Sequence, residues 1–292
     1  MQDEITKKVI LELHIKLTHG EQARIYSKGT DNIDAYLMAM QAQWYSFLWN
    51  KNRNLEARRL VEKAIVLAPD YAYAYRILGM THVVDLFVGL SQSPKKSLVL
   101  AMDAYKKAIS LDKSLASAYL GMSFVLTLLR KHDEAVSIGK KAIELEPNSA
   151  DVLQGYAAIL TFSGMVEEAI PLFREVRRLN PIPSNSYYHS FGHALRLSGK
   201  YEEAIALQRK AIKQEPDDHL SYIILGYSAS MAGRDEEAQA AVKEILRIRP
   251  NFSVADLIAP FKDRTILEQN CEALNKAGLS LNCDALRKTA SK

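Results

Sequence analysis

The sequence predicts an all-α fold, a right-handed α–α superhelical solenoid of about six helical hairpins with extra N- and C-terminal helices. Spacings of 34 or 35 residues separate the prolines that end successive segments, namely Pro147, Pro181, Pro216 and Pro250. A fixed period of about 34 residues is typical of stacked helix–turn–helix repeats. In the same register a small residue recurs once per repeat, at Ala57, Ala101, Ala135, Ala169, Ala204 and Ala238. Such a stack presents a long concave surface instead of a closed catalytic pocket.

Three zones follow from this register. Residues 1–37 are expected to form an N-terminal helix, over about 3–18, and a linker that joins the repeats to an upstream domain absent from this sequence. Residues 253–292 are expected to form capping helices and a frayed tail, because the end of a solenoid must be covered. The six repeats between them are expected to occupy 38–71, 72–115, 116–149, 150–184, 185–218 and 219–252.

The two helices of each repeat are expected to cross at small residues. The recurring alanine lets the second helix pack closely against the first, where a branched side chain would hold them apart. Glycine occupies the close-contact position of the first helix in three repeats, at Gly79, Gly192 and Gly226. Paired carboxylates such as Glu202 and Glu203 begin the second helices, where the helix dipole favours negative charge, and are not acid–base pairs.

The second repeat, 72–115, is longer than its neighbours. Its first helix is predicted to extend until Ser91 and Pro94 turn the chain. The residues that this longer hairpin exposes, unless something covers them, are Leu86, Phe87, Val88 and Leu90. Two interpretations remain open: these residues pack on the second helix through Leu98 and Met102, or they form a projecting knob that binds a partner.

Composition excludes several classes of protein. A net charge of +4, with no run of five lysines or arginines, does not indicate a nucleic-acid binder. No stretch of about 18 apolar residues could span a membrane, and the N-terminus lacks the apolar core of a signal peptide. We therefore expect a cytoplasmic protein. Cys271 and Cys283 are expected to be reduced thiols, the alternative being a disulfide that closes the last loop.

Motifs for catalysis and cofactor binding are scarce. The sequence has no phosphate-binding glycine loop, paired-cysteine metal motif or nucleophile elbow, so we expect no enzyme activity and no cofactor. His189 and His193 are four residues apart, which puts both imidazoles on one helix face, as in helical zinc sites. No cysteine or carboxylate shares that face, and Arg196 would repel a cation. We therefore expect these histidines to make polar contacts with a ligand.

The register also predicts which side chains line the concave groove. The predicted partner-binding residues are Tyr73, Arg76, Met80, Leu120, Phe124, Gln154, Phe162, His189, His193, Arg196, Ile223, Tyr227 and Met231. Aromatic residues and methionine are frequent among them, which suits an extended peptide or a helix of a partner protein. Because histidines and arginines lie on the same wall, we expect acidic or amphipathic ligands to be preferred.

The repeat pattern resembles the tetratricopeptide repeat. Four near-identical phrases carry the resemblance: Asp133-Glu-Ala-Val, Glu167-Glu-Ala-Ile, Glu202-Glu-Ala-Ile and Glu236-Glu-Ala-Gln. Tetratricopeptide domains that hold chaperone C-termini use a clamp of lysines and asparagines in the groove, and the resemblance does not extend to that ligand. The corresponding positions here carry Arg76, Leu120, Phe124 and Ala158.

Segments outside the repeats resemble a narrower group of proteins. Residues 2–10, 16–25 and 28–36 are similar to the segment that joins a small α/β domain to the repeats in bacterial proteins similar to class III adenylate/guanylate cyclases. Residues 260–279 are similar to the ending of that same group. The resemblance implies that this chain is the sensory or scaffolding part of a larger signalling protein. None of a cyclase's metal-binding aspartates or nucleotide-binding motifs can be placed in it.

A non-catalytic interaction module is the function that these observations favour. Such a module binds a protein segment in its groove and regulates an output domain of its parent protein. The expected partner is a protein or peptide, or an upstream domain of the same chain. The alternatives are a self-associating scaffold without a heterologous ligand, present as a homodimer, and a fragment of a transcriptional regulator.

The first predicted helix gives a test of self-association. The residues of its apolar stripe, four apart, are Ile5, Val9, Leu13 and Leu17. A short helix must bury such a stripe, either against the first repeat near Trp44 and Leu48 or against a second copy. If copies pair, changing Ile5 and Leu13 to lysine turns a dimer into a monomer, measured by light scattering, without loss of helical circular dichroism. An unmodified chain that is already monomeric at high concentration rules the pairing out.

Overall fold

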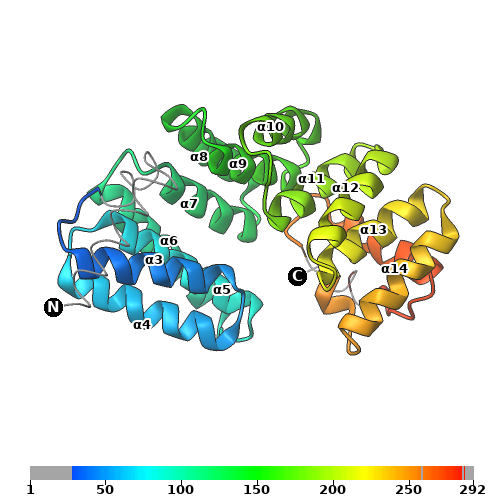
Figure 1. The fold of residues 1–292 in the computed structure, drawn as a ribbon, viewed down its shortest axis with the longest axis horizontal. Coiled ribbons are helices and arrows are strands. Elements are labelled where there is room, and N and C mark those ends of the chain that lie inside the picture. The colour runs from blue at the N-terminus through cyan, green and yellow to red at the C-terminus, as the bar shows by residue number, and fades with distance from the viewer. Residues whose placement is uncertain (1–27, 258, 285, 287–292) are drawn as a thin grey trace. The chain divides into compact units, whose positions relative to one another are not determined.

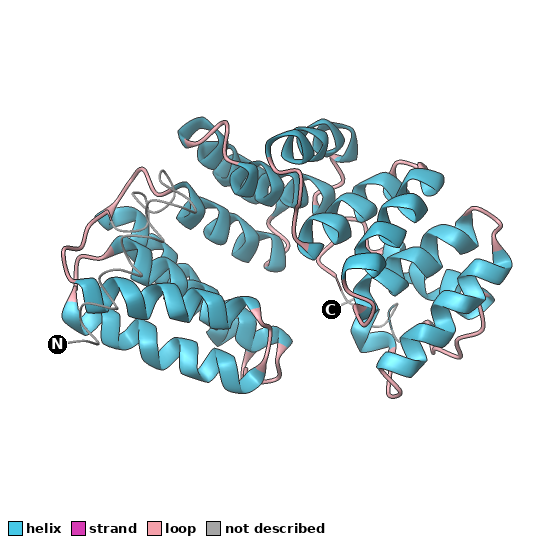
Figure 2. Cartoon of the chain, in the orientation of Figure 1, coloured by secondary structure: helices cyan, strands magenta, loops and turns pink. Residues whose placement is uncertain are grey.

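The computed structural model describes residues 28–257, 259–284 and 286 (Figure 1). The helix predicted over 3–18 and the end of the predicted tail lie outside this part of the chain. The described residues form two compact units, divided between Val125 and Leu126. Thirteen α-helices and one 3₁₀ helix make up the regular structure of these residues, which contain no strand (Figure 2). The predicted all-α class is confirmed.

The first unit contains two complete helical pairs and most of the helix that follows. Its helices are α3 (Ile33–Phe47), α4 (Lys51–Leu67), α5 (Ala72–Phe87), α6 (Pro94–Leu111) and the larger part of α7 (Ala116–Leu128). Asparagine caps fix the starts of the first pair, because each side-chain oxygen accepts a hydrogen bond from an otherwise unpaired backbone N–H. The Oδ1 atom of Asn32 accepts from the backbone nitrogen of Ala35 at 3.0 Å, and Asn50 caps α4 in the same way.

The second unit holds the remaining repeats and the C-terminal segment. Its helices are α8 (His132–Leu145), α9 (Ala150–Phe162), α10 (Val166–Leu179), α11 (Asn185–Leu197), α12 (Tyr201–Gln214), α13 (His219–Met231), α14 (Asp235–Ile248), η1 (Val254–Leu257) and α15 (Thr265–Lys276). The second helices of the pairs, α8, α10, α12 and α14, lack a side-chain cap but carry acidic residues in their first turns. The predicted position of the carboxylate pairs is confirmed, since the helix dipole favours negative charge there.

Alanines at the helix crossings are buried in both units. All six alanines of the predicted repeat position have no exposed surface, from Ala57 to Ala238. A glycine on the facing helix admits an equally close approach. A Cβ atom added at Gly192 would lie 2.1 Å from the Nε2 atom of Gln208. That nitrogen donates a hydrogen bond to the carbonyl oxygen of Tyr188 at 2.8 Å, so any side chain at this glycine would displace a buried polar contact.

The second repeat is lengthened, as predicted. Its helices α5 and α6 have 16 and 18 residues, against 13 and 14 in α9 and α10. A buried carboxylate fixes the extension, because Asp85 accepts hydrogen bonds from Asn54 at 2.8 Å and from Arg58 at 2.7 Å. Burial alone would raise the pKa of Asp85, but His82 and Arg58 outweigh it through hydrogen bonds and charge, and the pKa is lowered.

The tip of this long hairpin is partly covered. Phe87 is 49% exposed, and its ring meets the ring of Trp49 edge-on at 5.2 Å between centroids. Leu86, Val88 and Leu90 are partly buried, and Leu98 is buried in the second helix of the pair. The described residues therefore leave an aromatic edge exposed at the hairpin tip, and the expected knob stays a prediction.

A disulfide joins Cys271 and Cys283, whose sulfurs are 2.08 Å apart. The expectation of reduced thiols is therefore wrong for this structure, and the alternative, a disulfide that closes the last loop, is confirmed. The cause lies in the loop after α15, where the side chain of Asn275 donates to the oxygen of Leu281 at 2.9 Å and accepts from its nitrogen at 2.8 Å. These bonds turn the chain back and bring the two cysteines together.

None of the helices in the described part of the chain is long and apolar enough to cross a lipid bilayer.

The alanine crossings give a test of the packing. Ala204 of α12 has no exposed surface, whereas Ala206 of the same helix is exposed. Replacing Ala204 by leucine is expected to lower the free energy of unfolding by about 1–3 kcal/mol through overpacking. Replacing Ala206 by leucine is the matched control and should change it by less than about 0.5 kcal/mol. Equal urea midpoints for the two variants would contradict a close crossing at Ala204.

Candidate functional site

The predicted groove residues of the second unit lie on its inner helices, α9, α11 and α13. We call this set the inner wall. It comprises Gln154, Phe162, His189, His193, Arg196, Ile223, Tyr227 and Met231. Arg196, Ile223 and Tyr227 are 9%, 4% and 3% exposed. Met231 is exposed, and the remaining four residues are partly exposed. The inner wall is therefore assembled, but part of it is covered.

A segment beyond the repeats covers the inner wall. Residues 259–264, which we call the return segment, run from η1 to α15, and Phe261 in their middle is 1% exposed. The ring of Phe261 lies 5.2 Å from the ring of Phe162 on α9 and 5.5 Å from that of His193 on α11. The C-terminal region was expected to cap the last repeat. It also enters the predicted groove, which the sequence analysis missed.

Backbone hydrogen bonds hold the return segment in place. The backbone nitrogen of Lys262 donates to the carbonyl oxygen of Phe162 at 2.7 Å. The guanidinium of Arg130, in the turn before α8, donates to the carbonyl oxygens of Phe261 and Lys262. The ammonium of Lys262 lies 2.8 Å from a carboxylate oxygen of Asp133. The return segment is therefore held through its backbone as well as through its aromatic side chain.

Arg130 occupies a backbone position that favours glycine. Its φ is +66°, in the left-handed region, where residues with a Cβ atom are uncommon. The corresponding turns of the next three repeats carry Gly164, Gly199 and Gly233, all with positive φ. This departure from the repeat pattern was the one sequence signal that could have identified Arg130 as a functional residue.

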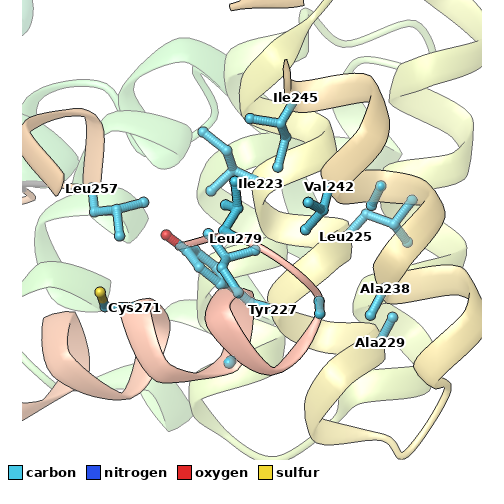
Figure 3. Close-up of a cluster of buried hydrophobic side chains, with 14 of the residues drawn as sticks. Ile223, Leu225, Tyr227, Ala229, Ala238, Val242, Ile245, Leu257, Cys271 and Leu279 are labelled. Atoms are coloured by element: carbon cyan, nitrogen blue, oxygen red, sulfur yellow. The ribbon is translucent and has the colours of Figure 1, made fainter. Parts of the chain in front are cut away.

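C-terminal residues also cover the wall at α13. Figure 3 shows the side chain of Tyr227 among Ile223, Leu257 and Leu279, in a cluster that includes residues of η1 and of the loop after α15. The guanidinium of Arg196 lies over the ring of this tyrosine, 5.1 Å from its centroid. Tyr227 thus contacts the chain itself in this conformation, and an external ligand reaches it only if these groups move.

Arg196 and His193 form a buried polar pair. The Nε atom of Arg196 donates to the Nδ1 atom of His193 at 3.1 Å. Burial, together with the charges of Arg196 and His189, holds the pKa of His193 well below its usual value, so its imidazole is neutral near pH 7. Burial also lowers the pKa of Arg196, to about 10. The pair therefore carries one positive charge inside the wall.

His189 has a different partner. Its Nε2 atom lies 2.5 Å from a carboxylate oxygen of Asp218, the N-cap residue of α13. The same carboxylate accepts from Ser221 at 2.6 Å and from Asn185 at 3.2 Å. The two histidines of the predicted pair therefore belong to separate contacts. The sequence analysis missed Asp218, because it caps the helix that follows, α13, and does not lie on the helix face that carries His189.

The predicted groove residues of the first unit form a second set. Tyr73 is 1% exposed, and the guanidinium of Arg76 lies 5.2 Å from its ring centroid. Arg76 also approaches the sulfur of Met80 at 3.9 Å. Leu120 and Phe124 on α7 are partly exposed. The binding role of all five residues stays a prediction.

Comparison with known proteins identifies the repeat. Residues 189–251, which include most of the inner wall, match a family model described as tetratricopeptide repeat. Three solved structures share the fold. PilW, a "widely conserved type IV pilus biogenesis factor", is 16% identical; the match covers 70% of this chain and 90% of PilW, with a TM-score of 0.55. Pseudomonas aeruginosa pilF is 17% identical over 75% of this chain and 93% of its own, with a TM-score of 0.52. A tetratricopeptide repeat protein of Parabacteroides merdae is 14% identical over 88% of this chain and 97% of its own, with a TM-score of 0.51. The predicted tetratricopeptide resemblance is confirmed.

A curated relative is similar in sequence. The Rhizobium meliloti protein named "Putative adenylate cyclase 3" is 29% identical over 135 residues, which are 46% of this chain. The matched part is 23% of that protein's own length. The predicted resemblance to cyclase-like bacterial proteins is confirmed, while the chain corresponds to less than a quarter of this relative.

Asp218 gives a test of the histidine contact. Burial alone would raise the pKa of Asp218, but His189 and the bonds from Ser221 and a backbone N–H outweigh it, and the pKa is lowered. A carboxyl of this kind stabilises the fold above its unfolded pKa of about 4, and the stabilisation is lost as the pH falls through the lower folded value. Asp218→Ala should cost about 1–2 kcal/mol near pH 7, through loss of the cap and its partners.

The measurement is urea unfolding from about pH 7 to about pH 3. The difference between wild type and Asp218→Ala should begin to shrink below about pH 4, where the carboxyl of the unfolded chain takes up a proton, and should level off once the folded carboxyl is protonated at a lower pH. Asp217→Ala is the matched control, because that neighbouring side chain is 78% exposed in its ion pair with Arg247, and such pairs contribute little. A difference that does not change with pH would show that the Asp218 charge does not matter.

Proposed function

We propose that this chain binds an extended segment of a partner protein along its inner wall, as the regulatory part of a larger bacterial signalling protein. Tetratricopeptide repeat folds are scaffolds for protein or peptide partners and are generally non-catalytic. The proposal adds two points to this general role. The inner wall on α9, α11 and α13 is the binding surface, and the ligand is an extended peptide.

The contact between the wall and the return segment carries the proposal. A stretch of this chain already lies on the wall, with one aromatic side chain beside Phe162 and His193. Its backbone bonds to Phe162 and Arg130 involve only main-chain atoms of the bound stretch. Because any peptide offers such atoms, a segment of another protein can satisfy the same donors and acceptors. The aromatic position then supplies the selectivity.

The signalling role rests on the sequence relative. The name of the Rhizobium meliloti protein refers to adenylate cyclase, and this chain resembles a stretch of it. A groove that binds peptide can regulate an output domain if the bound segment belongs to that domain or to its activator. We propose this arrangement for the parent protein, with the present chain as the part that binds.

Self-association is a second candidate function, favoured by an exposed patch of the first unit. Its members lie at the end of α3, the following turn and the end of α5. The patch consists of Trp44, Phe47, Leu48, Trp49 and Phe87, which are 44–63% exposed. Clustered large apolar side chains of this kind mark contact surfaces in soluble proteins. Light scattering on the whole chain separates a homodimer from a monomer that awaits a different partner.

The compartment stays a prediction. The sequence analysis predicted a cytoplasmic protein, whereas the Cys271–Cys283 disulfide is of a kind that persists mainly in oxidising compartments. Thiol alkylation of the chain taken directly from cells distinguishes the two, because only reduced cysteines are labelled.

Peptide selection tests the binding function. Peptides selected from a random library on the whole chain should bind a variant with both His193→Ala and Arg196→Ala about tenfold more weakly, since an ionic hydrogen bond contributes about 1.5–3 kcal/mol. The matched control changes Lys210 and Lys213, two exposed residues of α12, to alanine and should leave affinity unchanged.

Circular dichroism confirms that each variant is folded. Selected peptides that bind the double variant and the wild type equally would place the binding site elsewhere, with the aromatic patch of the first unit as the next surface to test.

A further inference from the structure

We propose that Arg196 anchors a carboxylate-binding site beneath the return segment, and that its ligand is an acidic, aromatic-containing segment of a partner protein that displaces Phe261. The inference rests on the proposed function of the inner wall and names the chemistry of its partner. Three observations carry it: an unsatisfied buried cation, a covering segment of the wrong charge, and an aromatic pocket that is already formed.

The unsatisfied cation is the guanidinium of Arg196. The residue is only 9% exposed, and within the described part of the chain one of its terminal nitrogens has no hydrogen-bond partner. Its Nε atom donates to His193, and its guanidinium carbon lies over two aromatic rings, 5.1 Å from the centroid of Tyr227 and 5.7 Å from that of Phe261. A buried charged donor without an acceptor is costly, and a carboxylate is the group that compensates it best.

The neighbours of Arg196 do not supply this counter-charge. His193 is a neutral imidazole, because its pKa is lowered by burial and by Arg196. The groups that partly oppose the effect of burial on the pKa of Arg196 are Tyr227 and Tyr201, and neither is a carboxylate. Among the described residues, the wall therefore holds a positive charge that a carboxylate of a ligand can pair.

The return segment has the wrong charge for this wall. It carries Lys262 and Arg264 to a surface that already holds Arg130 and Arg196. Burial lowers the pKa of Arg130, and the like charge of Arg264 lowers it further. Like charges of this kind disfavour a complex, and opposite charges favour it. An acidic segment would reverse the mismatch.

The ion pair of Lys262 compensates its charge only weakly. Lys262 pairs with Asp133, whose side chain is 93% exposed, so solvent screens the attraction. Asp263 accepts hydrogen bonds from the backbone nitrogen and the hydroxyl of Thr265 at the start of α15. These contacts leave the charge at Arg196 uncompensated.

The aromatic pocket defines the second part of the ligand. Phe261 lies beside Phe162 and His193, and the guanidinium of Arg196 lies over its ring. Because Arg196 is only 9% exposed, a carboxylate reaches it when the covering Phe261 leaves, and a ligand with an aromatic ring of its own replaces the ring contacts that are lost. The chemistry that fits is an aromatic residue followed closely by acidic residues.

Three synthetic peptides test this chemistry. The first has the chain's own sequence 258–265 with blocked ends. In the second, Lys262 and Arg264 are replaced by glutamate, and in the third by glutamine. In a whole-chain variant with Phe261→Ala, which removes the competing ring, the acidic peptide should bind at least about tenfold more tightly than the glutamine peptide. Equal affinity of these two peptides would overturn the inference.

Arg196 is tested in the same background. Adding Arg196→Gln should abolish the preference for the acidic peptide, whereas Arg209→Gln, an exposed arginine of α12, should preserve it. A preference that survives Arg196→Gln would assign the carboxylate to another cation and overturn the proposal.

Displacement is measured on the unmodified chain, which requires no variant to fold. Hydrogen–deuterium exchange at residues 259–264 should become faster when the acidic peptide saturates the chain, and unchanged protection would overturn the displacement. The test separates the two proposals. Library peptides that depend on the inner wall but show no acidic preference sustain the proposed function and defeat this inference, and peptides that ignore the wall defeat both.

Discussion

The close crossing of two helices at a fully buried alanine is the constraint on which the other features of this protein depend. Because Ala169, Ala204 and Ala238 leave no room for bulk, each hairpin repeats nearly the same geometry. Equivalent positions then face the same side in successive repeats. His193 on α11 and Tyr227 on α13 occupy such equivalent positions, 34 residues apart. Helix packing thus fixes the positions of the inner wall, and the residue types at these positions determine its chemistry.

Segments outside the repeats determine how much of the inner wall is exposed. The return segment places Phe261 between α9 and α11, and residues of η1 and of the loop after α15 cover Tyr227. The repeat alone would offer an open aromatic surface with a buried cation. With the return segment in place, the same surface is largely closed, while Arg196 still has a donor without an acceptor. The inner wall thus comes from the repeats and the return segment from outside them, and the two match in shape better than in charge.

The sequence predicted the repeat helices well and the return segment that covers them poorly, for physical reasons. Repeat period and small residues at crossings are local signals, so the helices, the lengthened second repeat and the wall positions on α9, α11 and α13 could be read from them. Contacts between distant segments leave no periodic signal. The bond of Lys262 to Phe162 and the approach of Asp218 to His189 are of this kind. Only Arg130, at a turn position where its neighbours have glycine, gave a local hint.

The return segment is attached to the wall's own unit at both ends. Before it, Leu257 is 4% exposed in the core cluster of α13 and α14, and after it Leu274 of α15 is fully buried there. A stretch held this closely acts at an effective concentration in the millimolar range for short flexible tethers. A freely diffusing ligand at micromolar concentration is therefore outcompeted by the return segment. A segment carried by the same polypeptide, or by a protein already bound to it, also has a high effective concentration and can compete. If the proposed function holds, the wall therefore favours a ligand that is tethered to this chain or to a protein bound to it, and a dissolved peptide binds only at a concentration high enough to outcompete the tethered segment.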